Sequence, residues 1–248
     1  MASMIAFSKA RAAGESIPEI VCYEKQSSPG GLWNYTWRTG LDAHGEPVHN
    51  SMYKQLFSNT PKECIELVDY TFQDHFGKPV GSYPPRESLY KYVMARFKKH
   101  QCEEWIRCNT SVKNVSFDEE TKKFTVLARA LESETEVTEQ FDYVTVACGH
   151  FSTPYIPNID GFQSFQGRVV HAHDVRNAQE FKNQRVLVVG SSYSAEDIGS
   201  MAWKNGATEV VISMRNTSTW SYKWPEHIST KSLLTKVEGE TIHFQDGS

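Results

Sequence analysis

The chain has 248 residues, of which 39% are hydrophobic and 23% charged, as is typical of a globular protein with one or two domains. Its formal net charge of -4 gives no electrostatic attraction to nucleic acid or to an anionic membrane surface. No apolar run approaches the roughly 20 residues of a membrane span, and charged residues interrupt the N-terminal apolar positions, so neither a span nor a signal peptide is expected.

The first predicted elements are a helix and a short strand. Residues 2–13 are alanine-rich, which predicts a helix that ends at Gly14. Residues 20–23, IVCY, predict a buried strand that stops at Glu24. A carboxylate ends the second strand of a dinucleotide-binding βαβ unit, because it can accept hydrogen bonds from ribose hydroxyls. Only one glycine precedes this strand, so we expect the first strand and its glycine-rich turn to be missing from the chain.

The middle of the chain changes from a helical to an extended pattern. A glycine- and tryptophan-rich loop leads to two stretches predicted to be helical, residues 61–72 and 85–100. The second carries one apolar stripe, formed by Leu89, Tyr90, Val93, Met94 and Phe97. Four stretches with period-two patterns then predict antiparallel strands, at residues 111–117, 122–130, 134–141 and 142–149.

A second βαβ unit is complete in the sequence. The strand RVLVVG is followed by the helix SSYSAEDIGSMAWKNG and the strand EVVISMR. Gly190, Ser192 and Ala195 occupy the spaced positions of a G-x-G-x-x-G/A turn, and a serine still lets the backbone approach a pyrophosphate. Arg215 ends the second strand where an NAD site carries an acidic residue. It therefore favours the 2′-phosphate of NADP, and an arginine that caps a sheet edge is the alternative.

Together these segments resemble the class B flavin-dependent monooxygenases, and within them the bacterial-type flavin-containing monooxygenases that oxidise trimethylamine. The most specific match is FQGRVVHAHD, in which Phe165, Gly167 and His171 reproduce an F-x-G-x-x-x-H fingerprint. Val175 departs from the pattern, because the family has an aromatic residue there. Five further segments resemble the family: EKQSSPGGLWNYTW, FSNTPKE, ACGHFSTPYIP, VVGSSYSAEDIG and YKWPE.

The resemblance implies binding sites for FAD and NADP and gives residues for each. Glu24 and Lys25 would hold the adenosine ribose of FAD. The segments that would lie along the flavin and its pyrophosphate contribute Gly31, Leu32, Trp33, Asn59 and Thr60. Asn59 is the catalytic candidate, since in this family it touches flavin and nicotinamide and helps protect the oxygenated flavin. The residues implied for NADP are Gly190, Ser191, Ser192, Tyr193, Ser194 and, at the 2′-phosphate, Arg215.

The implied fold is α/β with two Rossmann-like dinucleotide-binding modules. Residues 1–152 would form an incomplete FAD domain with an antiparallel β excursion, and residues 153–248 an NADP domain, with parts missing at both ends. The implied reaction is NADPH- and FAD-dependent oxygenation of tertiary amines or sulfides by O2, through a flavin C4a-hydroperoxide. A truncated, non-catalytic NADP-binding remnant and a Baeyer–Villiger-type monooxygenase are the alternatives. A homodimer is left open.

Several side chains also have simpler interpretations. His171 and His173 alternate, but no third ligand accompanies them, so we expect no metal and expect His171 to hold the inter-module linker by hydrogen bonding. Glu196 and Asp197 are interpreted as partners of the positive end of a helix dipole. The alternating aromatic residues are either one face of a core strand or rings that stack on a ligand: Trp33, Tyr35 and Trp37.

The five cysteines are scattered, and no pair has C-x-x-C spacing. This pattern predicts reduced, mostly buried thiols in a cytoplasmic protein. A disulfide between Cys102 and Cys108 is the weaker alternative.

Overall fold

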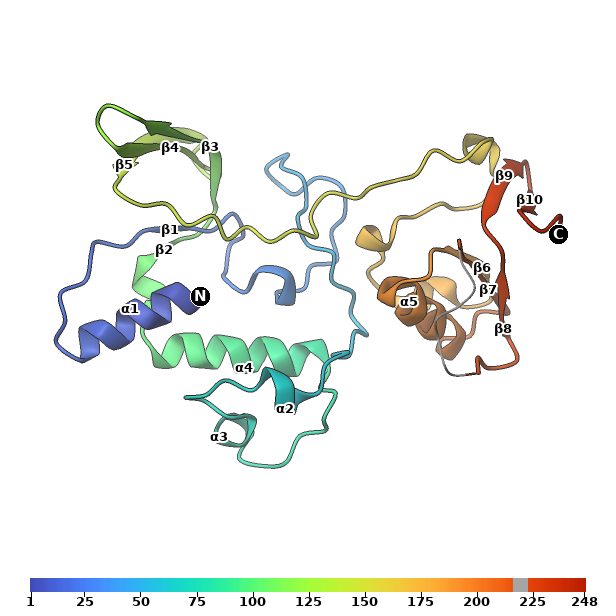
Figure 1. The fold of residues 1–248 in the computed structure, drawn as a ribbon, viewed down its shortest axis with the longest axis horizontal. Helices are drawn as coiled ribbons and strands as arrows, with labels where there is room; N and C mark the ends of the chain where they lie inside the picture. Colours follow the sequence, from blue (N-terminus) through green and yellow to red (C-terminus); the bar gives the residue numbers. More distant parts are fainter. Residues whose placement is uncertain (216–222) are drawn as a thin grey trace. The chain divides into compact units, whose positions relative to one another are not determined.

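The computed structural model describes residues 1–215 and 223–248, which form two compact units (Figure 1). Unit 1 comprises Met1–Tyr35, Leu41–Val48 and Leu56–His150. Unit 2 comprises Thr36–Gly40, His49–Gln55 and Phe151–Ser248. Two short segments from the first quarter of the chain therefore fold with residues 151–248.

Unit 1 contains the two long predicted helices. α1 (Ala2–Ala12) and α4 (Arg86–Lys99) confirm the helices expected from the sequence. Met4 and Ile5 of α1 are buried with Phe97 of α4, and this cluster is part of the core of unit 1. On another side of α4, Tyr92 is buried against Phe72, with their ring centroids 4.0 Å apart.

The helix predicted over residues 61–72 is wrong in its centre. The structure has a four-residue helix, α2 (Lys62–Ile65), and then α3 (Phe72–Phe76). Between them side chains bind the backbone groups that a helix would pair: the Tyr92 hydroxyl accepts from the Leu67 N–H at 2.8 Å and donates to the carbonyl of Tyr70. α3 begins at a capping box and ends at a left-handed Gly77.

The strands of unit 1 form two small sheets. β1 (Cys22–Tyr23) pairs in parallel with β2 (Ile106–Arg107). The other sheet has the antiparallel order β3-β4-β5. Its strands confirm three of the four predicted extended stretches: β3 (Thr110–Asp118), β4 (Lys123–Ala130) and β5 (Thr135–Phe141).

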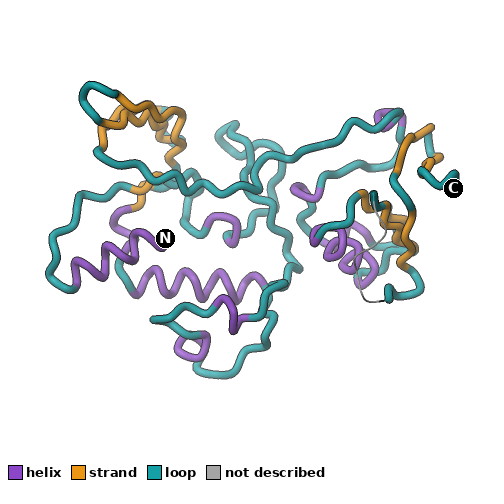
Figure 2. Tube along the Cα trace, viewed as in Figure 1, coloured by secondary structure: helices purple, strands orange, loops and turns teal. Residues whose placement is uncertain are grey.

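The fourth predicted strand, over residues 142–149, is wrong. This stretch follows β5 as an extended loop (Figure 2), and its Tyr143 and Val146 are largely exposed. An alternating apolar pattern becomes a strand only when a neighbouring strand supplies hydrogen-bond partners. Among the described residues no strand pairs with it.

Unit 2 is built on a parallel sheet of order β6-β7-β8, with α5 packed against it (Figure 1). β6 (Arg185–Val189), α5 (Tyr193–Lys204) and β7 (Glu209–Ser213) confirm the predicted βαβ unit. The strands that the sequence did not suggest are β8 (Ile228–Lys231), β9 (Leu234–Glu238) and β10 (Thr241–Phe244).

The remaining elements of the structure are short 3₁₀ turns. They are η1 (Gly31–Trp33), η2 (Cys102–Trp105), η3 (Phe162–Ser164), η4 (Ala172–Asp174) and η5 (Ala178–Phe181).

Over residues 1–215 and 223–248, no helix has both the length and the apolar character needed to cross a membrane.

All five cysteines are free thiols, so Cys102 and Cys108 form no disulfide. The prediction that the thiols are mostly buried is wrong, because only Cys102 is buried. Cys22 and Cys108 are half-buried, and Cys64 and Cys148 are exposed.

Candidate functional site

The turn between β6 and α5 has the geometry of a phosphate-binding loop. Gly190 has φ +130°, which side-chain-bearing residues rarely adopt, and a Cβ built there would meet nothing within 4 Å. The Gly190 N–H donates to the carbonyl of Ser213 at 2.9 Å, which fixes the turn to the end of β7. The backbone of the turn is therefore held in place beside open space.

The first turn of α5 is open to solvent. Ser192 is the N-cap residue, and its side chain makes no capping hydrogen bond to the helix. Ser191, Ser192, Tyr193 and Ser194 are all exposed, and Tyr193 is 73% exposed. Because the first N–H groups of a helix lack partners within it, this end of α5 can receive an anion. The four predicted residues thus lie together at one helix terminus.

Arg215 lies just beyond β7, at the same carboxyl edge of the sheet as Gly190, and is exposed. The preceding residue is held in place, because the Met214 N–H donates to the carbonyl of Lys231 at 3.0 Å. Arg215 therefore follows a fixed strand end and has a side chain accessible to a ligand.

Gly199 has a packing role that the sequence did not suggest. A Cβ at Gly199 of α5 would lie 3.1 Å from Cδ1 of Ile212 on β7, so glycine allows close contact between helix and strand. Its position four residues after Ala195, within the same turn-and-helix pattern, was the signal that could have indicated it.

Glu24 is held at the end of β1 in unit 1. Its N–H donates to the carbonyl of Arg107 and its carbonyl accepts from the Thr110 N–H, both at 3.0 Å. Its half-buried carboxylate accepts from the Gln26 N–H at 2.9 Å. The orientation of this carboxylate is thus set by the backbone around it.

The glycine-rich loop after β1 is tied to Glu24 through Gln26. The side-chain amide of Gln26 donates to the carbonyl of Gly31 at 3.2 Å, and the Lys25 ammonium donates to the carbonyl of Pro47. Leu32 and Trp33 continue the loop in η1, both half-buried. The structure therefore brings the predicted Glu24 and Gly31 together, through a glutamine that the sequence did not single out.

Gly30 has a steric reason to be glycine. Its φ is +129°, and a Cβ there would lie 2.5 Å from Cε2 of Tyr90 on α4. Close approach of the loop to α4 therefore excludes a side chain at this position.

Asn59 lies at the tip of a tight turn in unit 1. The buried Ser58 donates its N–H to the carbonyl of Pro84 at 2.9 Å and its hydroxyl to the carbonyl of Thr60 at 2.6 Å. This turn leaves the side chain of Asn59 exposed, where its carbonyl oxygen is 3.4 Å from the Thr60 hydroxyl. Asn59 and Thr60 thus form one polar turn that is held in place by the hydrogen bonds of Ser58.

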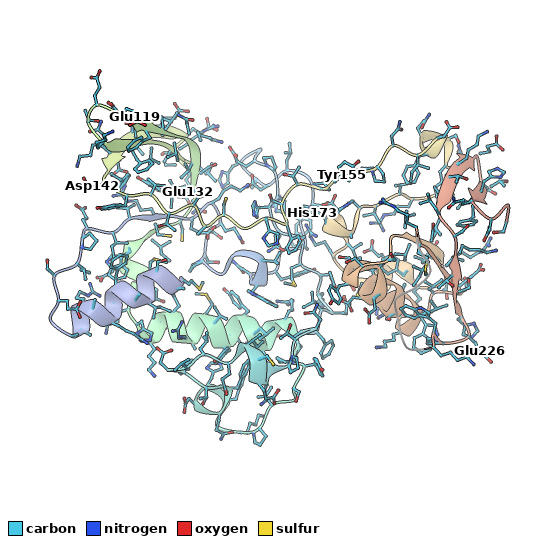
Figure 3. The ribbon with its side chains drawn as sticks, in the orientation of Figure 1. Glu119, Glu132, Asp142, Tyr155, His173 and Glu226 are labelled. Carbon is cyan, nitrogen blue, oxygen red and sulfur yellow. The ribbon has the colours of Figure 1, made fainter. Side chains whose placement is uncertain are left out.

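His171 lies next to a 3₁₀ turn and not in a strand. Its Nδ1 accepts from the N–H of His173 at 3.0 Å, while the buried ring of His173 (Figure 3) pairs with Asp174 at 2.8 Å. Within the described ranges, no three His, Cys, Asp or Glu side chains are grouped to hold a metal ion. The observed bond of His171 is within its own segment.

Trp37 rules out the core-strand interpretation of the alternating aromatic residues. Trp33 is in a 3₁₀ turn and Trp37 is 71% exposed. Trp37 and His171 instead line a cavity of about 540 Å³ within unit 2.

Of the YKWPE segment, Tyr222 lies outside the described residues.

The fold of the chain is the α/β fold of flavin-dependent monooxygenases of known structure. The crystal structure of Tmm from Pelagibacter sp. strain HTCC7211 matches 99% of this chain and 55% of its own, with a TM-score of 0.95 at 45% identity. The S-allyl-L-cysteine S-oxygenase from Allium sativum matches 99% of this chain and 57% of its own, with a TM-score of 0.83 at 26% identity.

The chain belongs to the flavin-binding monooxygenase-like family, whose model matches residues 5–229. It is 52% identical to the trimethylamine monooxygenase of Methylocella silvestris, over 100% of this chain and 55% of that protein. It is 53% identical to the trimethylamine monooxygenase of Roseovarius nubinhibens, with the same two coverages. The chain thus spans about half the length of these relatives.

Proposed function

We propose that this chain carries the dinucleotide-binding part of an NADPH- and FAD-dependent monooxygenase that uses O2 to oxygenate soft nucleophiles. The proposed substrates are tertiary amines such as trimethylamine, and sulfides. The observation that carries this proposal is the identity of 52–53% to two trimethylamine monooxygenases along the whole chain. That similarity favours N-oxygenation over the Baeyer–Villiger alternative.

Unit 2 is the proposed NADP-binding domain. The Gly190 turn would present backbone N–H groups to the pyrophosphate, and the exposed Ser192 and Ser194 would donate to its oxygens. The Arg215 guanidinium would form charge-assisted hydrogen bonds to the 2′-phosphate. The open space beside Gly190 and the exposed first turn of α5 fit such a group.

Unit 1 is the proposed FAD-binding domain, and its described residues fit part of that cofactor. The oriented carboxylate of Glu24 suits the ribose hydroxyls, and Lys25 follows it in the chain, with its ammonium bound to the carbonyl of Pro47. Open space next to Gly31 allows a ligand to approach the loop backbone. A glycine-rich phosphate turn next to β1 is not among the described residues, so the fit covers the ribose end and the loop.

When bound, FAD would accept a hydride from NADPH and react with O2, so the protein need not supply an acid–base pair. The proposed contribution of this chain is to bind and orient the two dinucleotides. Asn59 is proposed to direct its exposed side-chain amide to the flavin and the nicotinamide, supported by the fixed turn of Ser58 and Thr60. A homodimeric assembly and a cytoplasmic location stay predictions.

The proposal is tested by purifying the protein, reconstituting it with FAD and recording the absorbance spectrum of bound flavin. NADPH consumption is then measured with and without trimethylamine, and the product is analysed for the N-oxide. A ketone substrate distinguishes the Baeyer–Villiger reaction. Protein that binds neither flavin nor NADP, or that forms no N-oxide, contradicts the proposed activity. Binding of NADP alone supports the non-catalytic alternative.

A further inference from the structure

Residues 49–55, here called the strap, come from the first quarter of the chain but fold within unit 2. The hydroxyl of the buried Tyr53 donates a hydrogen bond to the carboxylate of Asp197 on α5. Asp197 is partly desolvated, and this burial raises its pKa. Its expected role as a helix-dipole partner is therefore incomplete, because the carboxylate also anchors a distant segment.

A second anchor holds the end of the strap. The side-chain amide of Gln55 donates to the Asn177 side chain at 2.6 Å, and its oxygen accepts from the Ala178 N–H at 3.1 Å. The Lys54 N–H donates to the carbonyl of Arg176 at 2.8 Å. The strap is thus fixed both to α5 and to the segment that precedes β6.

The α5 anchor is close to the candidate NADP residues in the helix. Asp197 follows Tyr193 by four positions and Ser194 by three, and residues with these spacings are neighbours on a helix surface. A ligand that orders the exposed first turn of α5 would therefore also restrict Asp197 and the hydrogen bond that it accepts.

The connection between the strap and the turn that carries Asn59 is short. Leu56 directly follows Gln55, and its carbonyl accepts from the Arg86 N–H at 2.9 Å within unit 1. Asn59 is three residues further along. A change in the conformational order of the strap must therefore also affect the order of these few residues.

We propose that the strap couples dinucleotide binding at the N-terminus of α5 to the order of residues 56–60, through the hydrogen bond between Tyr53 and Asp197. This inference rests on the proposed function, since it assumes that NADP binds at α5. Tyr53 is a positioning residue in this scheme and need not touch the dinucleotide. The coupling is one of conformational order, because a ligand that rigidifies one segment can rigidify those bonded to it.

Hydrogen–deuterium exchange of the full chain, with and without saturating NADP⁺, tests this coupling. In the unaltered chain NADP⁺ should slow amide exchange over residues 191–199 and, by at least about threefold, over residues 49–60. In Tyr53→Phe the protection of 191–199 should persist while that of 49–60 is lost. Asp197→Ala, which removes the acceptor, should give the same result and serves if Tyr53→Phe does not fold.

Tyr155→Phe is the matched control, since Tyr155 is 83% exposed on the loop before η3 (Figure 3) and should leave both protections unchanged. If NADP⁺ protects 191–199 but not 49–60, or if either Tyr53→Phe or Asp197→Ala keeps both protections, the coupling is refuted and the NADP site stands. If NADP⁺ binds nowhere, the proposed function and this inference both fail.

Discussion

Arg215 is the side chain that we expect to decide between the two nicotinamide dinucleotides. Replacing it with alanine should weaken NADP⁺ binding by about tenfold to a hundredfold, because charge-assisted hydrogen bonds to a phosphate contribute about 1.5–3 kcal/mol. Affinity for NAD⁺, which has no 2′-phosphate, should change little. Isothermal titration calorimetry with both dinucleotides measures the difference.

Arg185→Ala provides the matched control for Arg215→Ala. Arg185 is exposed at the amino end of β6, opposite the candidate site, and pairs with Glu209 at 2.7 Å. Its loss should leave both affinities unchanged. An equal loss of NADP⁺ and NAD⁺ affinity in Arg215→Ala would contradict a role at the 2′-phosphate.

Gly30 gives a steric prediction. Gly30→Ala should lower the free energy of unfolding by about 3 kcal/mol, because the new Cβ would meet Tyr90 at 2.5 Å and φ is +129°. Gly45→Ala is the control, since its φ is +74° with nothing within 4 Å, and it should cost only about 1 kcal/mol. Urea denaturation compares the two variants. An equal loss of unfolding free energy in the two variants would show that the contact with Tyr90 adds no destabilisation.

The sequence predicted some site residues from pattern and others only from resemblance. Glu24 and Gly190 stand at strand ends, where the βαβ rule applies, and both are found there. Gln26 could not be predicted, because its bond to Gly31 depends on how the loop folds back. No sequence pattern singled out Asn59, and the exposure of its side chain depends on the turn that Ser58 holds in place. The roles of these residues stay predictions.

At the level of helices, Asp69 links α1 to α4. Its carboxylate is 2.6 Å from Lys9 of α1 and 2.8 Å from Arg96 of α4, and it also contacts His100 at 3.0 Å. Hydrogen bonding to Lys9 and Arg96 holds the pKa of Asp69 well below its ordinary value. An aspartate whose pKa falls on folding stabilises the native state above its unfolded pKa and loses that contribution as the pH drops.

Asp69→Asn should therefore lower the free energy of unfolding at neutral pH by about 2 kcal/mol. The difference from the unaltered chain should shrink below about pH 4, where the unfolded aspartate becomes protonated. Denaturant titrations across this pH range test both expectations. Glu87→Gln, which removes an exposed i,i+4 pair with Lys91, should have little effect at any of these pH values. A difference that is constant with pH would contradict the charge argument.

Helices and strands were predicted best where periodicity and local ends agreed, as in α4 and the βαβ unit of unit 2. The wrong predictions, over residues 61–72 and 142–149, have causes in the tertiary structure. The helix over 61–72 is interrupted because Tyr92 binds backbone groups in it from a distance of more than twenty residues. The apolar stretch at 142–149 lacks a neighbouring strand among the described residues. Neither cause is visible in a local pattern.

At the scale of the whole molecule, the division into units could not be predicted from the order of the chain. Thr36–Gly40 and His49–Gln55 belong to unit 2, although the segments on either side of each belong to unit 1. The side chain of the buried Arg176 contributes to this arrangement, because it bonds to both early segments. It donates to the carbonyl of Arg38 at 2.9 Å, to that of Asn50 at 2.6 Å and to that of His173 at 2.6 Å.

Arg176→Ala should therefore loosen the attachment of Thr36–Gly40 most, because His49–Gln55 keeps its hydrogen bonds through Tyr53 and Gln55. Losing a donor shared by several carbonyls should lower the free energy of unfolding of this unit by about 3 kcal/mol or more. Trypsin should then cleave faster after Arg38, whose carbonyl Arg176 binds in the unaltered chain. Limited proteolysis with mass spectrometry measures that cut, and Arg185→Ala serves as a surface control. An unchanged cleavage rate after Arg38 would show that other contacts hold the segment, and that Arg176 is not what makes unit 2 discontinuous.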